Sequence, residues 1–153
     1  MFHLVLFLHS AFRWLLLIAL LGSIVKAARG YARSAAFSAT DNALRHWTAT
    51  IAHLQLVMGV WLYLESPVTH AFRQSPAAGL RQPELRFFGI IHIVCMLTAV
   101  ILVTIGSAMA KRRKTDKEKF RTMLTWFSLT LLIILIAIPW PFSPLARRPL
   151  IRI

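Results

Sequence analysis

The chain has 153 residues, of which 58% are hydrophobic and only 15% are charged, and its formal net charge is +13. Soluble proteins carry roughly 25% charged residues, so this composition excludes a water-soluble globular domain and indicates a membrane protein. The basic residues lie between long apolar runs, as is usual at the ends of transmembrane helices, so we do not expect nucleic-acid binding. The single cysteine, Cys95, excludes a disulfide within the chain.

Four apolar runs are long enough to cross roughly 30 Å of hydrocarbon, which takes about 20 helical residues. The predicted helices span about residues 2–26, 43–64, 85–110 and 120–138. The first run is longer than the roughly 7–15-residue core of a signal peptide, so we expect it to be retained. Asp41 or Thr40 is expected to cap the second helix, and Pro139 and Pro141 to end the fourth.

The segment from Glu65 to Glu84 is the only sizeable predicted loop. It contains Pro67, Pro76 and Pro83, so we expect an irregular cap with at most a short turn of helix. No internal repeat divides the sequence. We therefore predict a single domain, residues 1–153, that forms an all-α bundle of four transmembrane helices.

The distribution of basic residues predicts the orientation of this bundle. The first and third loops, with the adjoining helix ends, carry eleven Lys and Arg residues, whereas the second loop and the tail carry six. The side richer in Lys and Arg faces the cytoplasm. We expect a multi-pass protein of the bacterial inner membrane with both termini on the outer, periplasmic side.

Three histidines lie within predicted transmembrane helices, where ionisable residues are costly and therefore candidates for function. His9 and His92, on the first and third helices, each lie roughly 10 Å below the outer ends of these helices. Two imidazoles at one level on facing helices are what a bis-histidine haem b requires. We take His9 and His92 as candidate metal ligands; the alternative is that they are hydrogen-bonded packing residues.

His53, on the second predicted helix, lies deeper, about twelve residues from the outer end. The fourth helix has no histidine that would pair with it, so we expect one haem rather than two. His53 is a candidate ligand of a second haem, a contact for a quinone oxygen or a proton relay.

Arg13 follows His9 by four positions and so shares its helical face, one turn deeper. A guanidinium keeps its charge, so it needs a partner inside the membrane. A haem propionate, Glu65 or a quinone carbonyl would serve. Gly59 and Gly89 lie at a similar level, where they would either leave room for a flat macrocycle or allow close helix packing.

Four segments, one on each predicted helix, carry a resemblance to known proteins. They are HSAFRW (His9 to Trp14), TDNALRHWTATIAHLQLVMGVWLYLESP (Thr40 to Pro67), RFFGIIHIVCM (Arg86 to Met96) and IPWP (Ile138 to Pro141). They resemble a family of small four-helix bacterial membrane proteins labelled cytochrome b-like, common in Bacteroidetes, which implies haem. The chain is also similar to four-helix dihaem cytochromes b, but these use one or two histidines on their last helix, which this chain lacks.

The favoured hypothesis is a haem b protein that exchanges electrons with quinone or with a redox partner at the outer face. His9, His92, His53 and Arg13 are its candidate cofactor-binding residues. The alternative is a cofactor-free accessory subunit of a larger respiratory, photosynthetic or transport complex. A small channel or transporter is a third possibility, although no repeat or broken helix points to a substrate site.

Overall fold

The computed structural model describes residues 1–143, 146 and 148. Its elements are the helices α1 (Phe2–Ala32), α2 (Ala39–Glu65), α3 (Pro67–Gln74), α4 (Pro76–Gly79), α5 (Pro83–Arg86), α6 (His92–Arg112) and α7 (Asp116–Ala137), with a π-helical turn at Phe87–Ile91. The segment Pro83–Arg112 runs through α5, the π turn and α6 as one continuous span. Together with α1, α2 and α7 it makes four helices long and apolar enough to cross a membrane. The predicted all-helical class is confirmed, and no strand occurs among the described residues.

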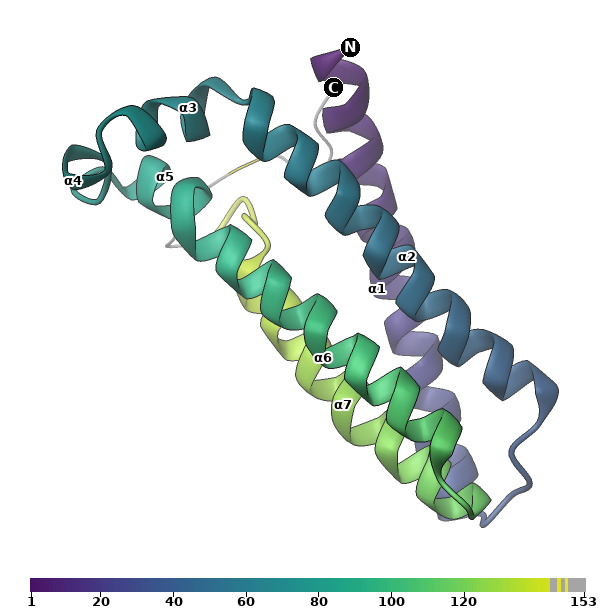
Figure 1. The fold of residues 1–153 in the computed structure, drawn as a ribbon. Helices are drawn as coiled ribbons and strands as arrows, with labels where there is room; N and C mark the ends of the chain where they lie inside the picture. Colours follow the sequence, from purple (N-terminus) through teal and green to yellow (C-terminus); the bar gives the residue numbers. More distant parts are fainter. Residues whose placement is uncertain (144–145, 147, 149–153) are drawn as a thin grey trace.

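The four long helices pack as a bundle (Figure 1). α7 lies against both α1 and α6, and α2 packs more extensively on α1 than on α6. α3, α4 and α5 gather at one end of the bundle, and the N-terminus and the end of α7 lie at that same end (Figure 1). We call this the capped end and the opposite end the basic end. The placement of the capped end on the periplasmic side stays a prediction from the charge distribution.

Two helix ends differ from those expected from the sequence. α1 continues to Ala32, and the N-cap of α2 is Ser38 rather than Asp41 or Thr40. The Asp41 N–H donates to Ser38 Oγ (3.2 Å), while the Ser38 N–H donates to Asp41 Oδ2 (2.9 Å). This reciprocal capping box satisfies two otherwise unpaired donors, which explains why the helix begins earlier than its apolar run.

The segment predicted as an irregular cap contains three short helices instead. α3, α4 and α5 each have proline in their first turn. Proline is favourable there because its fixed φ suits a helix and its missing N–H would have been unpaired. Phe72 of α3 is buried against Gly89, where a Cβ would lie only 2.2 Å from Phe72 Cγ. At Gly89, therefore, the missing side chain serves close packing of the cap.

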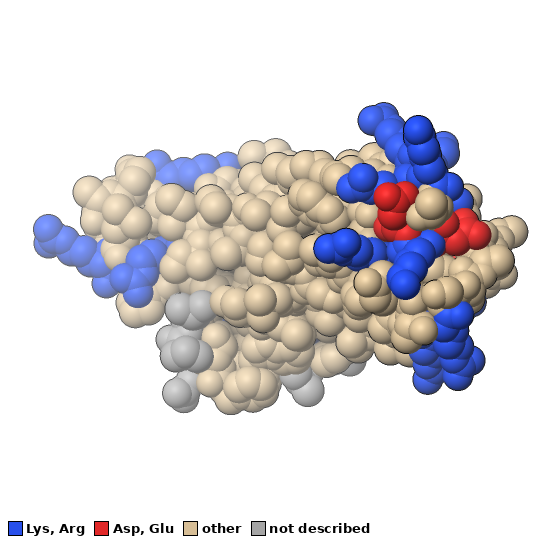
Figure 2. Space-filling view, turned by 90° about the horizontal axis from the view of Figure 1, so that it is seen from below, with Lys and Arg blue, Asp and Glu red and all other residues tan. Residues whose placement is uncertain are grey.

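The apolar side chains divide into a buried core and an exposed belt. The core runs along the contacts of α7 with α1 and α6 and includes Leu20, Val103 and Phe127. α6 and α7 approach closely at Gly106, where a Cβ would lie 2.3 Å from Trp126 Cβ. Many leucines, isoleucines and valines remain exposed, and Lys and Arg gather toward the ends of the molecule with an uncharged belt between them (Figure 2). This arrangement indicates a lipid bilayer environment.

A buried arginine joins two of the long helices near the basic end. Arg45, only 5% exposed, donates from Nη1 to the backbone oxygen (2.9 Å) and the hydroxyl of Ser107 on α6. Its Nε and Nη2 both donate to Asn42 Oδ1, at 3.2 and 2.9 Å. Nearby, the hydroxyls of Ser23 and Thr48 lie 2.9 Å apart and so link α1 to α2.

Replacing Arg45 by leucine should destabilise the bundle, because the acceptors on Ser107 and Asn42 would lose a charged donor. We expect Arg45→Leu to lower the free energy of unfolding by about 2 kcal/mol. Thermal unfolding of the detergent-solubilised protein would measure the loss. The matched control is Arg33→Leu, the same change at an exposed position, which should have little effect. Equal effects of the two variants would contradict this account of Arg45.

Candidate functional site

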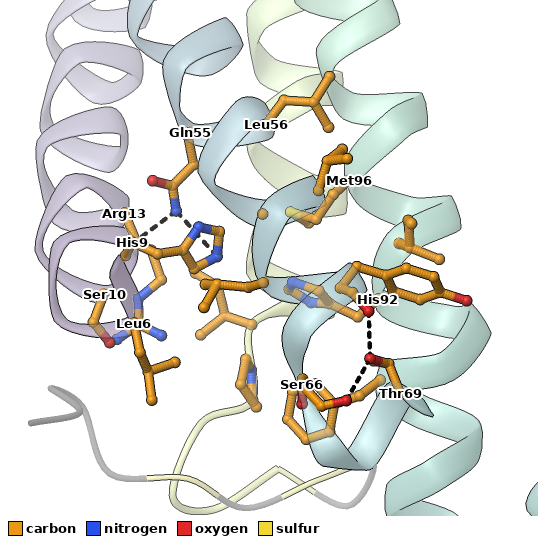
Figure 3. Close-up of a pocket in the computed structure, with 18 of the residues that line it drawn as sticks. Leu6, His9, Ser10, Arg13, Gln55, Leu56, Ser66, Thr69, His92 and Met96 are labelled. Carbon is orange, nitrogen blue, oxygen red and sulfur yellow. Dashed lines mark hydrogen bonds between the residues drawn. The ribbon is translucent and has the colours of Figure 1, made fainter. Parts of the chain in front are cut away.

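A cavity of about 460 Å³ lies at the capped end, lined by residues of α1, α2, α3, the π turn, α6 and the end of α7 (Figure 3). This volume falls in the range of roughly 300–1,000 Å³ typical of small-molecule sites. Its walls are mainly apolar, with a few polar groups from several helices. His9, Arg13 and His92, three of the four candidate residues from the sequence, all line it.

His9 enters the cavity from α1 and is held by Gln55 of α2 (Figure 3). Gln55 Nε2 donates to the His9 backbone oxygen (2.9 Å) and lies 3.4 Å from His9 Nε2. His9 Nδ1 and Gln55 Oε1 are buried without a hydrogen-bond partner. Gly59 lies beside the ring, where a Cβ on this residue would be 3.2 Å from His9 Cε1. The site therefore holds a buried acceptor and a buried ring nitrogen that a ligand can satisfy.

His92 reaches the cavity from the start of α6, directly after the π turn. Its backbone N–H donates to Phe87 O, five residues back, which closes that turn. Such single π turns inside α-helices occur frequently at functional sites. His92 Nδ1 lies 2.9 Å from the backbone oxygen of Ala137 at the end of α7. Because a carbonyl oxygen only accepts, Nδ1 carries the hydrogen and Nε2 keeps its lone pair.

His9, Arg13 and His92 are close enough for their charges to interact with one another. The sequence placed the two histidines at one level from helix rise alone, and the structure brings both to one cavity. In this apolar cavity the imidazoles of His9 and His92 are suited to bind a metal or a hydrogen-bonding group of a ligand. The guanidinium of Arg13 is suited to a negative charge on the same ligand.

Two guanidinium groups line the cavity. Arg13 stacks over Trp14, with Cζ 5.6 Å from the ring centroid. Arg148, from the segment after α7, pairs with Glu84 and lies over Phe88 at 5.3 Å. These positive groups give the cavity a cationic margin that would suit carboxylates of a bound ligand.

The sequence analysis missed Gln55 and Arg148. Gln55 is an amide within an apolar helix, and this polar residue type at a membrane depth is the signal that could have identified it. Arg148 belongs to a basic, proline-containing tail with no periodic pattern, so only the fold reveals that it reaches the cavity. The other tail arginines counted for the orientation, Arg147 and Arg152, lie outside the described residues.

His53 does not line the cavity and is exposed on α2. Its Nε2 lies 2.9 Å from Thr104 Oγ1 on α6, and that hydroxyl donates to Val100 O at 2.6 Å. The Thr104 hydrogen is thereby engaged, so His53 Nε2 is the donor to Thr104. A haem or quinone contact by His53 would need a site outside this cavity.

No family model, curated protein or solved structure matches this chain. The cytochrome b-like resemblance therefore stays a prediction.

Replacing His53 by alanine should remove a link between α2 and α6 and leave the cavity intact. Hydrogen bonds between membrane helices contribute on average about 0.6 kcal/mol, so we expect His53→Ala to lower stability only by about this amount. Thr104→Val, which removes the partner of His53, should have a similar effect, and the double variant should add little more. Thermal unfolding of the three variants gives the comparison. A loss for the double variant equal to the sum of the single losses would exclude the link.

Proposed function

We propose that this chain is a membrane electron-transfer protein that binds one haem b in the cavity, where His9 and His92 would hold the iron. The observation that supports it best is the state of His92, which lines the cavity beside His9 and is held through Nδ1 with the Nε2 lone pair available. A metal-ligating histidine almost always donates its other ring N–H in this way, often to a backbone carbonyl. The porphyrin supplies the other ligands of the iron, so a pair of histidines is sufficient.

The remaining lining residues fit this group. Apolar walls would exclude water from the macrocycle, and Arg13 and Arg148 would balance its propionates. At Gly59 the missing side chain makes room for the His9 ring, which lies against α2 at this point. The haem, when bound, would supply the one-electron chemistry, and the protein would set its potential through the ligands and the burial of charge.

A quinone is the second candidate ligand, and a specific observation favours it. His9 Nδ1 and Gln55 Oε1 are both buried without a partner. In the tautomer that accepts from Gln55 at Nε2, His9 Nδ1–H would donate to a quinone carbonyl. This hydrogen bond would not need a metal, so the same cavity would then serve quinone binding alone.

Reduced-minus-oxidised absorption spectra of the detergent-purified protein test the haem proposal. We expect a sharp alpha band and about one haem b per chain. His9→Ala and His92→Ala should each abolish the band, because each removes one of the two residues that would hold the iron. The matched control is His70→Ala, an exposed histidine on α3, which should leave the spectrum unchanged.

An unchanged spectrum in both His9 and His92 variants would refute the ligand assignment. A colourless protein, expressed with ample haem, would refute haem binding. In that case retention of added quinone that is lost in His9→Ala would support the quinone site. Co-purification of the colourless chain with a stoichiometric partner would instead support an accessory subunit of a larger respiratory or photosynthetic complex.

We further propose that the protein lies in a bacterial inner membrane with the capped end and both termini in the periplasm. The support is the excess of Lys and Arg in the loops at the basic end. A reporter enzyme that is active only in the periplasm should be active when fused to the C-terminus and inactive when inserted into the loop between α6 and α7. The reverse pattern would show that the orientation is wrong.

A further inference from the structure

A second, smaller cavity of about 240 Å³ lies at the basic end of the bundle. We call it the basic pocket. Its walls come from the connection before α2, the first turn of α2, the last turn of α6 and the first turn of α7. The residues that line it are Phe37, Ser38, Ala39, Asn42, Lys111 and Lys119.

Two lysines supply the positive charge of the basic pocket. Lys119 Nζ lies 2.9 Å from Asp116 Oδ1 and 5.4 Å from the centroid of the Phe37 ring. That ring packs against the buried Phe120, at 4.9 Å between ring centroids, so Lys119 rests on an anchored surface. Lys111 is exposed and forms no ion pair with a described residue. Asp116 therefore offsets one of the two charges, and the other remains uncompensated.

Asn42 contributes hydrogen-bond donors to the same pocket. Its Oδ1 accepts from both Nε and Nη2 of the buried Arg45, at 3.2 and 2.9 Å. A guanidinium only donates, so this contact fixes the amide orientation, with the oxygen on Arg45. No described residue accepts from Asn42 Nδ2. The amide N–H groups are therefore what Asn42 can offer to a ligand.

The acceptors next to these donors are already engaged. The Ser38 hydroxyl donates to Asp41 Oδ2 at 2.6 Å and accepts from the Asp41 N–H at 3.2 Å. The start of α2 adds the positive end of its helix dipole. Ammonium and amide donors with no free acceptor among them are suited to an oxyanion and not to a cation.

The basic pocket also lies at the level where lipid headgroups are expected. Lys111 is in the last turn of one membrane-spanning segment, Pro83–Arg112, and Lys119 is in the first turn of another, Asp116–Ala137. Further Lys and Arg residues gather at this end of the molecule and attract anions to it (Figure 2). Basic pockets between transmembrane helices bind the headgroups of anionic phospholipids.

We propose that the basic pocket binds a phosphate group, held by Lys111, Lys119 and the amide of Asn42. This group is supplied by an anionic phospholipid or by free phosphate, which have the same oxyanion chemistry. The basic pocket shares no lining residue with the cavity at the capped end, so the proposal does not rest on haem or quinone binding.

Native mass spectrometry of the detergent-purified protein tests the proposal with added phosphatidylglycerol and, separately, phosphatidylcholine. We expect the protein to retain the anionic lipid in preference to the zwitterionic one. The double variant Lys111→Gln/Lys119→Gln should bind phosphatidylglycerol about 10-fold more weakly, because it loses both ammonium groups. The matched control, Arg112→Gln/Lys114→Gln, removes two charges at exposed positions outside the pocket and should bind nearly as well as wild type. Equal losses in the two double variants would overturn the proposal.

Asn42→Asp tests the role of the amide. Aspartate keeps an acceptor for Arg45 but replaces the N–H donors by a negative charge, so it should weaken phosphatidylglycerol binding while the lipid-free protein unfolds at no lower temperature. Unchanged lipid binding in folded Asn42→Asp would overturn the assigned geometry.

Inorganic phosphate distinguishes the two sources of the group. If it raises the unfolding temperature of wild type and not of Lys111→Gln/Lys119→Gln, the pocket takes free phosphate. If only phosphatidylglycerol does so, the phosphate comes from lipid. If neither stabilises wild type more than the double variant, the proposal fails. Haem spectra of the same samples test the proposed function separately, since neither substitution touches the cavity at the capped end.

Discussion

Within hydrocarbon no water can pair with a polar group, and the structure depends on this constraint throughout. At the basic end the constraint is met entirely by the protein's own groups: Arg45 distributes its donors over Ser107 and Asn42, and Asp41 closes a capping box with Ser38. The end of α7 also follows the rule, because the side chains of Trp140 and His92 donate to the carbonyls of Leu135 and Ala137, which have no partner within the helix.

The cavity is the place where the described part of the chain departs from this rule. His9 Nδ1 and Gln55 Oε1 are buried and have no partner, although the same bundle satisfies a buried arginine with four hydrogen bonds. Each unsatisfied group costs about 1–3 kcal/mol, a large fraction of the stability of a small protein. A cost of this size is expected where a ligand completes the pairing.

The sequence predicted the number, approximate spans and class of the helices because a run of about 20 apolar residues has few alternatives in a bilayer. It also brought His9, Arg13 and His92 together, since helix rise alone determines their depth. It did not predict the early start of α2, which depends on the pairing of Ser38 with Asp41, or the three short helices built on Pro67, Pro76 and Pro83. The π turn before His92 and the approach of Arg148 to the cavity depend on tertiary contacts, which periodicity does not encode.

The position of the cavity follows from how α2 and α6 are joined. At the basic end, Arg45 of α2 donates a hydrogen bond to Ser107 of α6. Closer to the cavity, His53 of α2 forms a hydrogen bond with Thr104 of α6. Toward the capped end, Tyr63, which lines the cavity, donates from its hydroxyl to Gly89 O at 3.0 Å in the π turn.

Between the second and third of these links no hydrogen bond or ion pair joins the described residues of the two helices. The facing residues there, among them Leu56 on α2 and Met96 on α6, line the cavity (Figure 3). The links on either side hold the helices at a fixed spacing, so the intervening apolar side chains are not required to close the space. His53, the one candidate residue outside the cavity, therefore contributes to the site indirectly, by holding α2 and α6 at the cavity's inner boundary.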